Sequence, residues 1–160
     1  MTKTIMSALA AAVLCGCAGA PCWTKKGPAC DAKCKDALCA DGMAEASVKS
    51  TALREETAEE RARAKLLSIL EARITRIMKD YSGPEGELTE RAMRSIAKGQ
   101  ISGAELFDRY TQSDGSVRAL VGINPAKFKK AVEDIPQIQE AARKFLRQRT
   151  DELLKEAEDK

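Results

Sequence analysis

Residues 104–123 read AELFDRYTQSDGSVRALVGI, and this segment predicts a β-hairpin. At its centre lies Asp114-Gly115, a pair that readily adopts the positive φ angles of a tight hairpin turn. After the turn, apolar side chains recur with the period of two that places them on one face of a strand: Val117, Ala119, Val121 and Ile123. The chain is therefore expected to build an antiparallel sheet around this hairpin.

The strand before the turn carries apolar residues for both faces of that sheet. Leu106 and Tyr110 are four residues apart and are expected on one face, with Phe107 on the other. Glu105 and Asp108 are three residues apart and are then expected on opposite faces. They would not form the close carboxylate pair that acid–base catalysis uses.

A long amphipathic helix is predicted for residues 51–81. Its apolar side chains follow one another at steps of three and four, the spacing of one helix face: Ala58, Ala62, Leu66, Leu70, Ile74, Ile77 and Tyr81. On the charged side, Glu59 precedes Arg63 by the four residues that suit a surface ion pair. The apolar stripe is interpreted as core rather than as the lining of a ligand groove.

Weaker signals complete the order of elements. Residues 36–46 predict a short strand, and residues 87–98 predict a helix that ends at Gly99. The apolar face of that helix is expected to hold Leu88, Ala92 and Ile96. Asn124-Pro125 has the residues of a helix N-cap followed by a first-turn proline, and Pro136 is expected to interrupt the helix that follows.

A final amphipathic helix is predicted for residues 137–160. Its apolar members are Ile138, Ala142, Phe145, Leu146 and Leu153. This stripe has two interpretations: it covers the chain's own domain, or it docks onto a second copy or an envelope protein partner.

The composition excludes several classes of function. The 160 residues carry a formal net charge of +3, without a concentrated basic patch, so nucleic acid is not an expected partner. The chain has no histidine, and therefore lacks the usual general base and the commonest metal ligand. We predict no catalytic residue, no metal and no cofactor, and hence a protein that is not an enzyme.

The first residues resemble a bacterial export signal. Lys3 gives a basic start, and an apolar run follows from Ile5 to Val13. This run is shorter than the ~20 apolar residues that a membrane-spanning helix needs. The signal is therefore expected to be cleaved, and two cleavage sites compete.

The favoured site lies before Cys17. The residues Leu14-Cys15-Gly16-Cys17 resemble a bacterial lipobox, in which the cysteine thiol takes a diacylglycerol, the chain is cut before it and the new amine is acylated, for example with palmitate. The alternatives are an ordinary cut after Ala18-Gly19-Ala20, which Pro21 disfavours, and an uncleaved anchor.

A triacylated Cys17 would hold the protein stably on a membrane, because one acyl chain binds only marginally and additional signals make the anchoring stable. In the enterobacterial sorting rule, an Asp after the lipidated cysteine retains the protein on the inner membrane. Ala18 occupies that position here. An outer-membrane location is therefore expected, on the periplasmic or the cell-surface face.

Four further cysteines follow: Cys22, Cys30, Cys34 and Cys39. In an exported protein such an even set predicts disulfides. The slightly favoured pairing is Cys22–Cys39 around Cys30–Cys34, because residues four apart share a helix face. Free thiols and a zinc site built from all four cysteines are the alternatives.

The sequence also resembles a family, the Lpp-twenty group of bacterial lipoproteins, over roughly residues 23–134. The carriers are ALREETAEERARAKLLSILEARITRIMKDY, ISGAELFDRYTQSDGSVRALVGI and FKKAVED, together with Trp23 soon after the lipobox and Gly42 in the first strand. The cysteine-rich insertion and the charged tail after Pro136 depart from the usual pattern. The resemblance implies an outer-membrane or surface lipoprotein with helices packed on a small antiparallel sheet. Relatives include antigens and flagellum-associated lipoproteins.

These predictions combine into an α+β fold. We expect a small antiparallel sheet of about three strands in β-α-α-β-β-α order, packed by the long helix and followed by a C-terminal amphipathic helix. The expected parts are a signal peptide (1–16), a Cys-rich anchor or linker segment (17–35), an Lpp-twenty-like α+β domain (36–134) and the C-terminal helix (135–160).

The expected function is that of a non-enzymatic envelope lipoprotein, anchored by acylated Cys17 and acting in assembly or protein binding at the outer membrane. Its expected partners are the membrane, through the lipid anchor, and a second copy or an envelope protein. The alternative is a lipid-tethered small-ligand-binding protein or enzyme.

Overall fold

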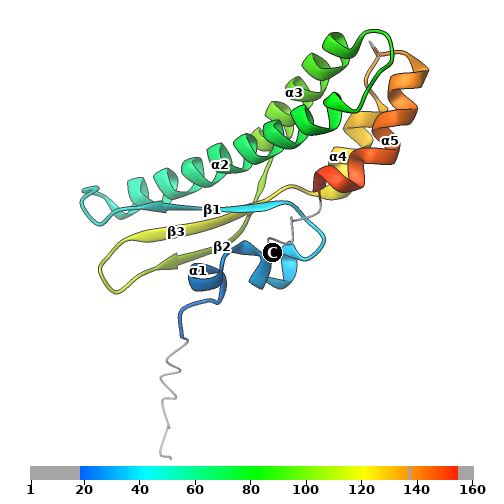
Figure 1. Ribbon diagram of the computed structural model, residues 1–160. Coiled ribbons are helices and arrows are strands. Elements are labelled where there is room, and N and C mark those ends of the chain that lie inside the picture. The colour runs from blue at the N-terminus through cyan, green and yellow to red at the C-terminus, as the bar shows by residue number, and fades with distance from the viewer. Residues whose placement is uncertain (1–18, 137, 155–160) are drawn as a thin grey trace, which may run out of the picture.

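The computed structural model describes residues 19–136 and 138–154. Within this part of the chain, helices pack on an antiparallel sheet of three strands (Figure 1). The strands are β1 (Cys39–Ala44), β2 (Glu105–Thr111) and β3 (Val117–Gly122). Because their spatial order is β1-β3-β2, the second strand of the hairpin lies in the centre and pairs with both neighbours. The predicted α+β class is confirmed.

The helices lie in three places around this sheet. They are α1 (Trp23–Lys26), α2 (Thr51–Lys79), α3 (Gly86–Ser102), α4 (Pro125–Glu133) and α5 (Glu140–Leu154). One face of the sheet lies against the first half of α2, and the other face lies against α1 and the turns that follow it (Figure 1). The second half of α2 extends beyond the sheet and packs with α3, α4 and α5, so the apolar core continues from the sheet into this group of helices.

Helix α2 approaches β1 closely because only small residues lie between them. A Cβ atom on Gly42 would lie 2.3 Å from the carbonyl oxygen of Ala58 and 2.3 Å from the backbone nitrogen of Ala62. Farther along α2 the buried side chains are large: Leu66, Leu70, Ile74, Ile77 and Met78. The predicted apolar stripe is thus confirmed as core, and its taper from alanine to leucine sets how near the helix comes to the sheet.

The charged side of α2 also forms contacts that the sequence suggested. Glu59 and Arg63 pair at 3.2 Å, as their spacing predicts. Glu59 binds Arg109 of β2 as well, and Glu55 binds the same guanidinium at 2.7 Å. The carboxylates of α2 therefore hold the outer strand of the hairpin.

The predicted hairpin turn is present at Asp114-Gly115. Gly115 has a φ of +84°, in the left-handed region that favours glycine. The Asp114 carboxylate accepts hydrogen bonds from the backbone N–H of Ser116 at 2.9 Å and from its hydroxyl at 2.7 Å. These hydrogen bonds hold the pKa of Asp114 below its ordinary value.

The face assignment within β2 was wrong because a β-bulge interrupts the alternation. Leu106 pairs with Val121, whereas Asp108 pairs with the adjacent Leu120, so Phe107 is an extra residue. Phe107 and Tyr110 consequently pack together on the face of Leu120. Leu106 lies on the other face and is 40% exposed. The expectation that both faces of the sheet are covered is confirmed.

The expected apolar face and end of α3 were also wrong. The buried positions are Thr89, Met93, Ala97 and Ile101, one residue later than expected, and the helix runs past Gly99 to Ser102. Burial of Ile101 extends the stripe by a further step of four. It offsets the cost of about 1 kcal/mol that a glycine imposes inside a helix.

The C-terminal helices close the end of the core. Asn124 caps α4 as predicted, its side-chain oxygen accepting N–H groups of Ala126 at 3.0 Å and Lys127 at 3.2 Å. On α5 and just before it, the buried apolar residues are Ile138, Ala142, Leu146, Leu153 and Leu154. They join the core that includes α2 and α4, while Phe145 packs on the Tyr81 ring with centroids 5.0 Å apart. The apolar stripe thus covers the chain's own helices, which favours the first of its two interpretations.

We expect Gly42→Ala to lower the free energy of unfolding by about 3 kcal/mol, because the methyl group would overlap the backbone of α2. Urea denaturation followed by circular dichroism measures the loss. Gly99→Ala is the matched control, since nothing lies within 4 Å of its Cβ position, and it should stabilise the protein by about 0.5–1 kcal/mol. Equal stability of Gly42→Ala and the wild type would contradict the close contact.

We expect Gly115→Val to cost on the order of 1 kcal/mol or more, because a β-branched residue is strained at positive φ. Thermal unfolding should show a melting temperature several degrees lower. Gly115→Asn, which tolerates this region better, should lose less. An unchanged melting temperature for the valine variant would show that the turn is misplaced.

Candidate functional site

Residues 21–38, here called the cysteine cap, form a compact unit on the face of the sheet opposite α2 (Figure 1). The cap contains α1 and two short 3₁₀ helices, η1 (Pro28–Cys30) and η2 (Ala32–Cys34). It directly follows the segment that holds the predicted lipidation residue. Cys17 itself lies outside the described residues, so its acylation stays a prediction.

The four cysteines form two disulfides, Cys22–Cys30 and Cys34–Cys39. Disulfide bonding is as predicted, but the favoured pairing was wrong. It assumed that Cys30 and Cys34 share one α-helical face, whereas each ends a separate 3₁₀ helix and the extended residue Asp31 lies between the two. The first disulfide closes the cap on itself, and the second ties it to β1. Both use the sulfurs that a zinc site would require.

Trp23 attaches the cap to the sheet. Its side chain is 1% exposed and packs in a cluster with Cys34, Cys39 and Leu120. The indole Nε1–H donates a hydrogen bond of 2.8 Å to a carboxylate oxygen of Asp108 in β2. A buried indole N–H needs such an acceptor, which gives Asp108 a structural role.

The β-bulge also corrects the expectation for the two carboxylates of β2. Glu105 pairs with Gly122 and Asp108 with Leu120, so both point to the same face of the sheet. They nevertheless have different partners, because Glu105 binds Lys127 at 3.2 Å while Asp108 accepts from Trp23. Each carboxylate is engaged separately, and the arrangement gives no support to an acid–base pair.

A second polar group lies where the cap, the sheet and α2 meet. Arg118 of β3 donates to the backbone oxygen of Thr24 in α1 and to the carboxylate of Asp41 in β1. Lys65 of α2 donates to the other oxygen of Asp41 at 2.7 Å. Burial disfavours the charged form of Asp41, but the hydrogen bonds from Lys65 and Arg118 outweigh it and hold the pKa of this carboxyl below its ordinary value.

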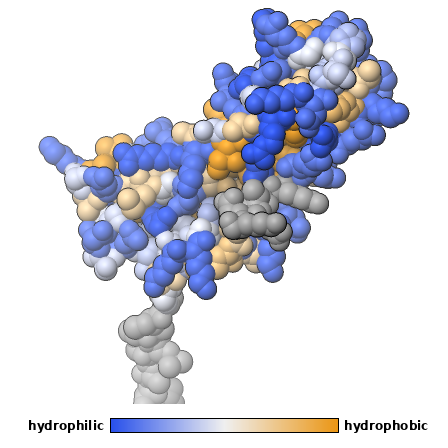
Figure 2. All heavy atoms as spheres, viewed as in Figure 1, coloured by the Kyte–Doolittle hydropathy of each residue, from blue (hydrophilic) through white to orange (hydrophobic). Residues whose placement is uncertain are grey.

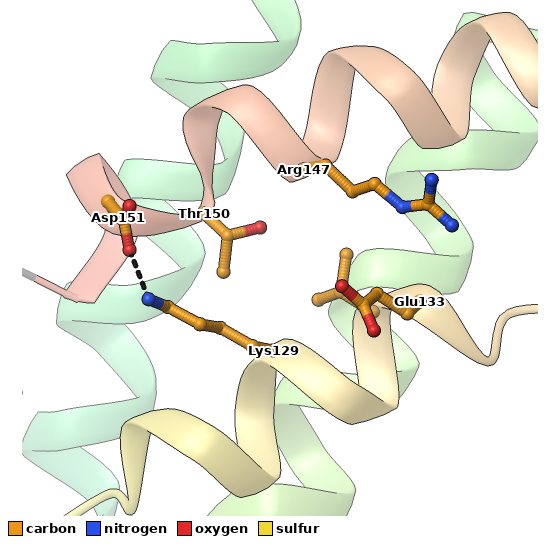
Figure 3. A pocket seen from close by; sticks show the side chains of 6 residues that line it. Lys129, Glu133, Arg147, Thr150 and Asp151 are labelled. Carbon is orange, nitrogen blue, oxygen red and sulfur yellow. Dashed lines mark ion pairs between the residues drawn. The ribbon is translucent and has the colours of Figure 1, made fainter.

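A groove lies between α4 and α5. It encloses about 70 Å³ and is lined mainly by charged and polar residues: Lys129, Val132, Glu133, Arg147, Thr150 and Asp151. Lys129 and Asp151 pair across it at 2.5 Å, while Glu133 on α4 and Arg147 on α5 lie farther along the groove (Figure 3). Organic ligands usually occupy about 300–1,000 Å³. The volume of this groove is therefore well below that of a usual organic-ligand pocket.

None of the helices within residues 19–136 and 138–154 combines the length and hydropathy needed to cross a membrane. The same residues contain no group of three or more acidic or cysteine side chains placed to hold a metal ion.

No protein-family model matches this sequence, and no curated protein matches it significantly. The resemblance to the Lpp-twenty lipoproteins therefore stays a prediction.

Sequence reasoning missed the polar groups that attach the cap. Trp23 and Asp108 are 85 residues apart, and no local pattern indicates that they meet. Asp41 gave a weak signal, because a charged residue in the middle of a short apolar strand needs a partner when it is buried. The sequence does not identify Lys65 and Arg118 as those partners.

We expect Asp41→Asn to lower the free energy of unfolding at pH 7 by about 1–3 kcal/mol, because it removes the carboxylate that Arg118 and Lys65 share. The folded-state pKa of Asp41 is lowered. Its contribution is therefore complete above the unfolded-state pKa of about 3.9 and is lost as the pH falls through the folded-state value.

Denaturation curves at pH 7 and near pH 3 test this expectation. The difference between the wild type and Asp41→Asn should shrink at the lower pH. Asp36→Asn, at an exposed position in the cap, is the control and should change stability by less than about 0.5 kcal/mol at either pH. If the difference in unfolding free energy between Asp41→Asn and the wild type did not change with pH, the role of the ionised carboxylate would be contradicted.

Proposed function

We propose that this chain is a non-enzymatic bacterial envelope lipoprotein similar to the Lpp-twenty group. It is held at the outer membrane by acylated Cys17 and acts there in assembly or protein binding. The observation that carries the proposal is the disulfide-bonded cap, which begins four residues after Cys17 and is packed onto the sheet.

The two disulfides support an exported protein. Such bonds persist in the periplasm and on cell surfaces, whereas cytosolic thiols are kept reduced. An export signal is also what residues 1–16 resemble. The lipobox reading of Cys17 and the oxidised state of the four cysteines therefore point to the same compartment, on independent grounds.

The cap also supports anchoring close to the membrane. Two peptide units join Cys17 to Gly19, the first described residue, so their Cα atoms are at most about 7 Å apart. Cys22 is fixed by its disulfide, and Trp23 by its burial. An acylated Cys17 would thus hold a folded domain rather than a long, free linker.

This geometry is better suited to assembly than to catalysis. The side of the molecule that carries α2 lies away from the cap and would face the space where a partner protein could bind (Figure 1). The alternative, a lipid-tethered small-ligand-binding protein or enzyme, would need a larger site than the groove of about 70 Å³ between α4 and α5.

We expect Cys17→Ser to abolish incorporation of labelled fatty acid and to release the protein from membranes, because the thiol is the proposed lipid acceptor. Membrane fractionation and intact-mass measurement test both effects. Cys15→Ser is the matched control and should keep the anchor, since it changes a neighbouring thiol and leaves a small residue in the lipobox. A mature wild-type chain that starts at Pro21 and carries no acyl group would contradict the proposal.

A further inference from the structure

The cysteine cap carries several exposed lysines. Lys25 and Lys26 form the last turn of α1, and Lys35 follows η2. All three are exposed, whereas Trp23 and Thr24 on the same turn of α1 are buried against the sheet. Lys25 and Lys26 therefore lie on the side of α1 that points away from the sheet, and Lys35 is exposed where η2 ends.

The positive charge of this surface is not neutralised within the cap. Residues 21–38 contain four lysines and two aspartates. Lys33 is already used, because its ammonium group donates to the carbonyl oxygen of Phe107 at 2.9 Å and stands over the Phe107 ring. Asp31 accepts the backbone N–H of Lys33 at the start of η2. Among the described residues, none forms a hydrogen bond or ion pair with the side chains of Lys25, Lys26 or Lys35.

The described part of the chain begins next to this surface. Its first residues, from Gly19 onward, reach the cap from the side away from α2, and Figure 2 shows hydrophilic side chains near this end of the described chain (Figures 1 and 2). Lys25 is eight residues after Cys17, and the intervening Cys22 is held by a disulfide. A lipid on Cys17 would therefore bring the cap, rather than any other part of the domain, to the membrane surface.

We propose that the cap surface formed by Lys25, Lys26 and Lys35 docks onto anionic phospholipid headgroups of the membrane that holds Cys17. This inference rests on the proposed lipid anchor and adds a defined orientation to it. The cap lies against the headgroups, the sheet lies above the cap, and α2 lies farthest from the membrane.

The expected energies are sufficient for orientation, although not for binding without the anchor. A lysine near an anionic surface strengthens the attraction by about fivefold, and the effect extends over a screening length of about 8–10 Å. Three lysines alone would bind weakly. Once an acyl anchor holds the protein on the membrane, the contact between the lysines and the headgroups becomes intramolecular. A weak attraction is then enough to favour one orientation. Lysine suits this role because it acts as a mobile point charge toward phosphate.

Trp23 provides an intrinsic probe, because it is the only tryptophan of the chain and lies in the cap. The mature lipidated protein would be reconstituted into phosphatidylcholine vesicles with or without about one third phosphatidylglycerol. Both kinds would contain a phospholipid with a nitroxide on its headgroup, which quenches fluorescence over a short range. We expect quenching of Trp23 to be at least about twofold greater in the anionic vesicles. Salt at about 1 M should remove the difference, because it shortens screening to ~3 Å.

The triple variant Lys25→Gln, Lys26→Gln and Lys35→Gln should lower the quenching in anionic vesicles to the level seen in phosphatidylcholine alone. The matched control is Lys49→Gln, Lys98→Gln and Lys130→Gln, which removes the same charge from exposed positions outside the cap. It should leave the quenching unchanged. Labelling of lysines by an amine-reactive reagent gives a second measure, with anionic vesicles expected to protect Lys25, Lys26 and Lys35 in the wild type.

Equal quenching in the two vesicle types, or quenching that both triple variants alter equally, would overturn the docking surface. Failure of the proposed anchor is a separate result, because intact mass would show Cys17 without acyl groups and the protein would not float with the vesicles. An acylated protein that floats but shows no charge-dependent quenching contradicts the docking surface alone.

Discussion

The close contact between β1 and α2 at Gly42 is the constraint on which the rest of the fold depends. No side chain fits between the strand and the helix there, since the backbone of Ala58 and Ala62 occupies the space. The helix therefore packs almost directly on the sheet, and the apolar layer between them is thin at this end. Larger side chains, from Leu66 onward, fill the core where α2 passes the end of the sheet and meets α3 and α5. The wedge shape of the core follows from this gradient of side-chain size along a single helix.

Because the apolar layer between the sheet and α2 is thin at this end, burial on the opposite face of the sheet matters more for the stability of the fold. The sheet has three strands, and the cap covers its second side with Trp23, Cys34 and Ala37 packed on Leu120. A segment of this length has too few apolar residues to fold by burial alone. The two disulfides restrict its unfolded states, and in chain-entropy terms such closures contribute a few kcal/mol. The indole of Trp23 then adds a directional contact through its hydrogen bond to Asp108.

The features predicted correctly are those that local sequence determines. The turn at Gly115, the N-cap at Asn124 and the stripe along α2 each depend on residues within a few turns or one hairpin. The errors arose where tertiary packing overrides a local rule. The bulge at Phe107 and the continuation of α3 past Gly99 depend on partners distant in sequence. The predicted disulfide pairing was wrong for a related reason. It assumed one α-helix where the chain forms two short 3₁₀ helices.

The polar contacts of the cap connect the anchor end of the chain to the opposite side of the molecule. From Thr24 in α1, the contacts pass to Arg118 in β3, to Asp41 in β1 and to Lys65 in α2. One of these links crosses from the cap to the sheet and another crosses from the sheet to α2. A lipid on Cys17 would thus be attached to a segment whose position is fixed relative to every layer of the fold. If the cap meets the membrane, the orientation of α2 is determined at the same time, and any partner of this lipoprotein would meet one defined face.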